Sequence, residues 1–98
     1  MMKHSSMCKF KEGVSPELIG EIITEFLKLP AKIPEIKSMI IGRDIGDRDY
    51  NYDVAWIMDF DSFETYKIYR ANDDHMAFVH KYLLPNIAAK ISVQFDAP

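Results

Sequence analysis

Three small or polar side chains share one face of the first predicted strand. Side chains alternate along the segment from Lys3 to Lys11, which places His4, Ser6 and Cys8 together. An imidazole, a hydroxyl and a thiol on a face that should pack against helices indicate room for a ligand rather than dense core. The alternative is that His4 is solvent-exposed at a fraying strand end. Because Cys8 has no basic partner other than His4, we interpret it as a small buried hydrophobe rather than a nucleophile.

A second histidine, His75, follows the polar run Asn72, Asp73 and Asp74. An imidazole works as a general base only while it is neutral. We expect the two adjacent carboxylates to favour the protonated ring and so to weaken it as a base near neutral pH. In the structural alternative, the ring only hydrogen-bonds a neighbouring strand or loop and fixes a kink in the helix.

Aromatic side chains could complete a ligand site. Tyr69 lies at the end of a predicted helix, where its role is either ligand binding or packing in the core with a satisfied hydroxyl. Ile23, Phe26, Trp56 and Phe78 could form the apolar walls of a cavity beside the first strand. The alternative for these four residues is ordinary core packing.

The elements that must position these residues alternate along the chain. Strands are predicted by alternation of side chains and helices by apolar residues three and four apart. Proline ends the first helix at Pro30 and the last helical segment at Pro85. The predicted strands cover residues 3–11, 36–42, 52–60 and 90–95, and the predicted helices follow the first and third of them.

The helix starts carry recognisable caps. Ser15, Pro16 and Glu17 supply a hydroxyl cap, a proline in the first turn and a carboxylate near the positive end of the helix dipole. Asp61 and Glu64 have capping-box spacing at the start of the second helix. That helix is expected to break, with the run from Asn72 to Asp74 capping a new segment from His75.

The order strand, helix, strand, strand, broken helix, strand is typical of the α+β ferredoxin-like fold, a split β-α-β-β-α-β unit. We therefore expect a four-stranded antiparallel sheet with both helices on one face. Met7, Met39, Ile41 and Ile57 are expected on the open face. Because an exposed apolar patch of that size is unusual on a monomer, we predict a homodimer in which two sheets close into an α+β barrel.

Composition narrows the functional classes. The 98 residues suit one domain spanning 1–98, and 12 Lys+Arg against 15 Asp+Glu leave a net charge of −3. We expect no nucleic-acid partner, because no basic run could hold phosphates. We also expect no membrane span and a cytoplasmic location, since the longest apolar stretch is far shorter than a bilayer requires. No cofactor motif or metal-ligand spacing is present, and the alternating charges of residues 43–49 indicate a solvated loop.

Six stretches at consistent spacing resemble the stress-responsive α/β-barrel (Dabb) proteins over nearly the whole chain. They cover residues 9–15, 29–38, 42–44, 52–53, 60–62 and 75–79. The resemblance implies a ferredoxin-like protomer and a homodimer with a β-barrel core. Family membership alone does not fix a function.

Plant polyketide cyclases of this family close an aromatic ring by an aldol-type condensation. By resemblance to them, His75 is implied to be a general base, Tyr69 to help bind the substrate and His4 to line the same pocket. Many members have His-Pro-Ala-His where this chain has Asn72 to His75, so the first histidine and the proline are absent.

Three functional hypotheses remain open from the sequence. In the first, a pocket between helices and sheet binds a small apolar carbonyl-bearing ligand without chemistry. In the second, the same pocket performs cyclase-like proton transfer, with His75 as base and with Tyr69 and His4 holding the enolate oxygen. In the third, the dimer itself is a structural stress-response protein.

Overall fold

The computed structural model describes residues 1–98, the whole sequence. Along the chain it contains β1 (Met2–Phe10), α1 (Pro16–Phe26), α2 (Leu29–Lys32), β2 (Ser38–Arg43), β3 (Val54–Phe60), α3 (Phe63–Ala71), α4 (Asp73–Phe78), the π-helical turn η1 (Val79–Leu83) and β4 (Ile87–Asp96). No helix is both long and apolar enough to cross a bilayer.

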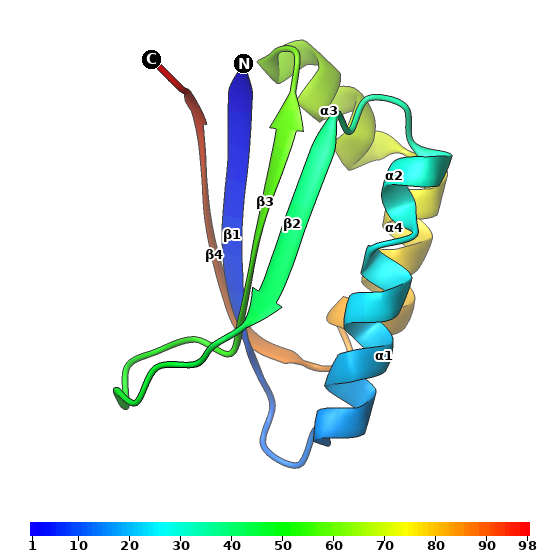
Figure 1. Ribbon diagram of the computed structural model, residues 1–98. Coiled ribbons are helices and arrows are strands. Elements are labelled where there is room, and N and C mark those ends of the chain that lie inside the picture. The colour runs from blue at the N-terminus through cyan, green and yellow to red at the C-terminus, as the bar shows by residue number, and fades with distance from the viewer.

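The strands form one sheet in the order β2-β3-β1-β4, and every neighbouring pair is antiparallel. The helices lie on one side of this sheet, and the loop between β2 and β3 projects away from them (Figure 1). The predicted α+β ferredoxin-like fold is confirmed.

The first helix begins where its cap predicts. Ser15 Oγ accepts a hydrogen bond from the Leu18 amide at 3.1 Å, and Pro16 occupies the first turn. The predicted end of this helix at Pro30 is wrong, because α1 stops at Phe26 and Pro30 lies in the first turn of α2. Proline is tolerated there because the amides of a first turn have no partner within the helix.

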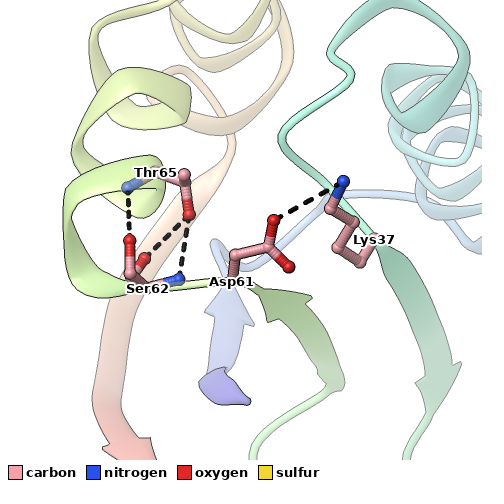
Figure 2. A network of polar contacts seen from close by, with 4 residues as sticks. All are labelled: Lys37, Asp61, Ser62 and Thr65. Carbon is pink, nitrogen blue, oxygen red and sulfur yellow. Dashed lines mark hydrogen bonds and ion pairs between the residues drawn. The ribbon is translucent and has the colours of Figure 1, made fainter.

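The capping box of α3 lies one residue later than predicted. Ser62 is the cap: its Oγ accepts from the Thr65 amide at 3.3 Å, and Thr65 Oγ1 accepts from the Ser62 amide at 3.1 Å (Figure 2). Asp61 instead forms an ion pair with Lys37 at 3.7 Å, across the gap between α3 and the segment that enters β2 (Figure 2). The Ser-x-x-Thr hydroxyls satisfy the first amides, so the predicted Asp61 and Glu64 pair is not needed.

The break before α4 positions His75. Asn72 ends α3 and caps α4, and its Oδ1 accepts from the amides of Asp74 at 2.8 Å and His75 at 3.3 Å. The α4 helix begins at Asp73, two residues before the predicted start of the segment. The predicted capping role of the Asn72 run is confirmed.

The core lies between the helices and the sheet. Alternate residues of β1 and β3 are buried there, as the burial of Cys8, Met58 and Phe60 illustrates. The prediction that Met39 and Ile41 belong to the open face is wrong. Ile41 pairs with Trp56 and Met39 with Met58, so both pack against the core, and the residue between them, Ile40, is 67% exposed. A run of three apolar residues carries no alternation that could have distinguished these faces.

β4 carries its apolar residues on the side away from the helices. Ile91 pairs with Met7 and Val93 with Ser5 across the open face, where Val93 is 55% exposed. The polar residues Lys90, Ser92 and Gln94 consequently lie on the helix-facing side, opposite Cys8, Ser6 and His4. This arrangement brings polar groups from two strands into the same layer as His75.

Candidate functional site

His4 is held from both sides by polar neighbours. Its Nδ1 accepts a hydrogen bond from Gln94 Nε2 at 2.9 Å, and its Nε2 lies 3.4 Å from Ser6 Oγ. Since Nδ1 accepts, the neutral ring carries its proton on Nε2. At 4% exposure His4 is not at a fraying strand end, so the exposed alternative is wrong.

Burial keeps the His4 ring neutral. Desolvation is the largest cause that lowers its pKa from 6.5 to about 4. The ammonium of Lys90, and the His75 ring once it is protonated, lower it further. At neutral pH His4 therefore acts as a hydrogen-bond donor through Nε2 rather than as a cation.

Tyr69 lies between the two histidines. Its ring centroid is 4.2 Å from that of His75 and 6.3 Å from that of His4. Burial raises the pKa of the Tyr69 hydroxyl, and the neighbouring Tyr66 raises it further, so the phenol keeps its proton. The structure thus brings His4, Tyr69 and His75 together, as the sequence predicts.

The orientation of the His75 ring is set by one backbone group. Its Nδ1 lies 3.1 Å from the carbonyl oxygen of Arg70, near the end of α3. A carbonyl oxygen only accepts, so Nδ1 carries the proton of the neutral ring and Nε2 keeps a free lone pair. The ring was expected to bond a neighbouring strand or loop at the kink, but its partner belongs to the preceding helix, so the bond joins α3 to α4.

The expected protonation of His75 is wrong. Burial is the largest influence on its pKa and lowers it, the Arg70 hydrogen bond raises it, and the charge of Lys90 lowers it again. Asp73 and Asp74 do not contribute to this shift, and both side chains are exposed. The ring is therefore neutral near neutral pH, the state in which an imidazole can accept a proton.

The predicted wall residues form a second aromatic group. The Phe26 ring centroid lies 5.0 Å from that of Trp56 and 4.6 Å from that of Phe78. Ile23 is partly buried against the same core. These contacts are those of close-packed core, and they place Trp56 beside the polar face of β1, where it pairs with Ser6.

Lys90, Gln94 and Tyr66 belong to the site, but the sequence reasoning did not identify them. The ammonium of Lys90 lies 5.9 Å from the Trp56 ring centroid, and the Tyr66 ring lies 4.8 Å from that of His4. The alternation of side chains in β4 could have identified two of them. Once the apolar residues of β4 are assigned to the open face, Lys90 and Gln94 must face the helices.

Cys8 contributes no nucleophile. Its side chain is 1% exposed. Desolvation is the first cause that raises its pKa from 9.0 to about 11, followed by the charge of Asp53. The thiol stays protonated at neutral pH, which confirms its interpretation as a small buried hydrophobe.

The cavities of the single chain border this group rather than include its rings. Gln94 and Met2 line one near the start of α3, and a cavity of about 420 Å³ lies on the open side of the sheet beside Tyr50 and Tyr52. None of the five is lined by His4, Tyr69 or His75. On the helix-facing side of β4, Lys90 and Ser92 are exposed, so this edge is the open approach to the group.

A comparison with known families identifies the one to which this fold belongs. The family model of the stress responsive A/B barrel domain, Dabb, matches residues 2–97. The chain belongs to the Dabb family. A curated Dabb relative, the stress-response A/B barrel domain-containing protein HS1 of Arabidopsis thaliana, is 31% identical over 84 residues, which cover 84% of this chain and 77% of HS1.

Solved structures extend the likeness of this Dabb chain. A dimeric ferredoxin-like protein of unknown function from Thermobifida fusca is 32% identical, with a TM-score of 0.87 over 98% of this chain and 90% of that one. The hydroxynitrile lyase of Passiflora edulis is 20% identical, with a TM-score of 0.88 over 99% of this chain and 93% of that one. At that identity the lyase shows a shared fold only.

Proposed function

We propose that this Dabb protein binds a small apolar carbonyl compound beside α3, α4 and β1, and that His75 removes a proton from the carbon next to the carbonyl. The observation that carries the proposal is the bond from His75 Nδ1–H to the Arg70 carbonyl oxygen. That bond leaves Nε2 as the free base of a neutral, oriented ring, which is what general-base catalysis needs.

The step balances without a cofactor. The C–H bond next to the carbonyl breaks, its proton goes to His75 Nε2, and its electron pair forms the carbon–carbon double bond of an enolate. The negative charge then rests on the former carbonyl oxygen. The imidazolium returns the proton to carbon, or to another site of the same molecule, and regenerates the base.

Two donors are available for the enolate oxygen. The Tyr69 hydroxyl keeps its proton because burial raises its pKa. The neutral His4 ring carries its proton on Nε2, where an enolate oxygen would replace the long contact of 3.4 Å with Ser6 Oγ. Donors held in place by packing stabilise a developing oxyanion without reorganisation. The ring spacing of 4.2 Å between Tyr69 and His75 puts a donor and the base beside each other.

The second candidate is ligand binding without a reaction. The close contact of the Tyr69 ring with the two histidine rings favours it. A purely structural dimer is the third candidate. These alternatives differ in what a bound carbonyl compound does: exchange of its acidic hydrogens requires the base, whereas binding alone does not.

We further propose that the functional unit is a homodimer joined through the open sheet face. Ile40, Ile91 and Val93 are 67%, 51% and 55% exposed there in the single chain. Apolar area of this extent is typical of an interface. The structurally similar Thermobifida fusca protein is dimeric, which supports the same assembly here.

Deuterium exchange tests the catalytic proposal directly. The dimer is incubated with phenylacetone in D₂O near neutral pH, and the loss of its benzylic hydrogens is followed by NMR. We expect protein-dependent exchange that disappears in His75→Ala and falls at least about tenfold in Tyr69→Phe. The control is His80→Ala, which alters an exposed histidine on the neighbouring turn.

Exchange that survives His75→Ala would contradict the assigned base. Chemical-shift changes at His4 and Tyr69 without any exchange would support the binding function instead. If carbonyl compounds cause neither hydrogen exchange nor chemical-shift changes, the result would favour the third candidate, a purely structural dimer.

A further inference from the structure

Two hydrogen-bond donors in this layer have no acceptor. Trp56 is 2% exposed, and its indole Nε1 has no hydrogen-bond partner. Lys90 takes part in none of the five ion pairs of the chain. A buried donor without a partner costs free energy, and such groups recur where a ligand completes the bond.

These two donors are neighbours. The Lys90 ammonium lies 5.9 Å from the Trp56 ring centroid, and Lys90 pairs with Cys8 on the helix-facing side of the sheet. Desolvation is the largest influence on the pKa of this ammonium and lowers it, whereas the nearby Cys8 raises it.

The groups around the ammonium do not neutralise it. From β1, the Cys8 thiol is protonated and His4 is neutral, and from α4, His75 is neutral as well. Asp53 lies near Cys8, and its carboxylate already accepts a hydrogen bond from the Phe10 amide at 2.8 Å. A cation that has no carboxylate partner, beside a mostly apolar layer, favours an anionic ligand.

We propose that Lys90 Nζ and Trp56 Nε1 together bind a carboxylate, so that the ligand of this site is an apolar carboxylic acid. This inference rests on the proposed ligand site and adds the charge of its ligand. A carboxylate has two oxygens, so it can accept from both donors at once. The rest of an aryl or alkyl acid then extends along Trp56 toward Tyr69 and His75, which gives the oxo-acids as the substrate class.

Trp56 reports on this site because the sequence contains one tryptophan. The emission of the dimer is titrated with 3-phenylpropionate and with its neutral isostere, 3-phenylpropionamide. We expect a saturable change in Trp56 emission with the acid and at least tenfold weaker binding of the amide.

Variants of Lys90 identify the donor. Lys90→Met should reduce the affinity for the acid to that for the amide, and Lys90→Arg should keep it within about threefold, because a guanidinium also binds carboxylates. The matched control is Lys81→Met, which removes an exposed lysine whose ammonium lies 5.1 Å from the Tyr82 ring on the helix side. It should leave the acid affinity unchanged.

Equal affinity for acid and amide would overturn the proposal, as would unchanged acid binding in a folded Lys90→Met variant or the absence of a saturable response. An equally strong response to inorganic phosphate would overturn the assignment to an organic carboxylate. If the acid does not bind through Lys90 but His75-dependent exchange of phenylacetone is still observed, the carboxylate site is contradicted and the proposed function is supported. If the acid binds through Lys90 but no exchange occurs, the role of His75 as a base is contradicted and the carboxylate site is supported.

Discussion

The layer between helices and sheet has two halves of different chemistry. Over β3 and β2, Trp56 and Met58 belong to the buried core and Ile41 packs against it, and the Phe26 ring of α1 lies 5.0 Å from that of Trp56. Over β1 and β4 the same layer holds an imidazole, hydroxyls, an amide and an ammonium, contributed by His4, Ser6, Ser92, Gln94 and Lys90. One sheet therefore presents an apolar and a polar surface to the same set of helices.

We expect the apolar half to contribute most to the stability of the fold and the polar half to contribute most to the proposed function. Apolar burial stabilises the fold in proportion to the area removed from water, whereas a hydrogen-bonded buried polar group contributes only modestly. A buried polar group is costly where it lacks a partner, as the Trp56 indole does. The His4 bond to Gln94 and the unpartnered Trp56 indole lie on neighbouring strands, β1 and β3, where the polar and apolar halves meet.

The largest expected effect of a single change lies in the apolar half. Phe26→Ala should lower the free energy of unfolding by about 4 kcal/mol, because it removes a ring 2% exposed and leaves a cavity. Tyr69→Phe, in the polar half, should cost less than about 1.5 kcal/mol while reducing proton exchange. Denaturant unfolding of both variants measures this contrast, and equal losses would contradict the division.

A charged substitution on the open face of the sheet tests the proposed dimer interface. Ile40→Asp should dissociate the proposed dimer, since burying an unpaired carboxylate in an interface costs several kcal/mol, roughly 2–5. Light scattering should then give the mass of one chain, 11.4 kDa, instead of two. The control is Ile68→Asp on the exposed surface of α3, where Ile68 is 54% exposed. A dimeric Ile40→Asp protein would place the interface elsewhere.

Acid should weaken the polar half selectively. The folded-state pKa of His4 is about 4 against 6.5 for the free side chain, so the unfolded chain binds a proton first as pH falls. Stability is complete above pH 6.5 and is lost between about 6.5 and 4, by roughly 2 kcal/mol once residual solvation of the ring is allowed for. In His4→Gln this part of the pH dependence should vanish. An unchanged slope would mean that folding does not lower the pKa of His4.

The smallest expected effect lies outside both halves. Ser15→Ala should lower the free energy of unfolding by about 1 kcal/mol, because the Leu18 amide loses its acceptor at the start of α1. Binding of 3-phenylpropionate should not change. A shift in the denaturation midpoint is the readout, and no shift would show that water replaces the serine at no cost.

Local signals made the architecture predictable. Alternation in β1, the cap at Ser15 and the break at Asn72 each depend on neighbours within a few residues, and each is confirmed. The face of β2 could not be predicted, because Met39, Ile40 and Ile41 are all apolar and only pairing with β3 fixes the register.

Three rings of the site were predicted to meet, but its other members and its electrostatics were not predicted. His4, Tyr69 and His75 meet as the family resemblance implies. The protonation of His75 was predicted wrongly, because sequence proximity to Asp73 and Asp74 says nothing about where those carboxylates point or how far the ring is desolvated. Lys90 was not predicted as a member of the site because it is distant in sequence from His4 and Cys8. Only the antiparallel pairing of β1 with β4 brings it beside Cys8.

The central claim is that His75 is a neutral base with its free lone pair on Nε2. Nitrogen-15 NMR of the histidine rings across a pH titration measures both properties in one experiment. We predict that His75 is neutral at pH 7, with its proton on Nδ1 and a pKa below 6.5. A His75 pKa above 6.5, or a neutral ring with its proton on Nε2, would contradict the account.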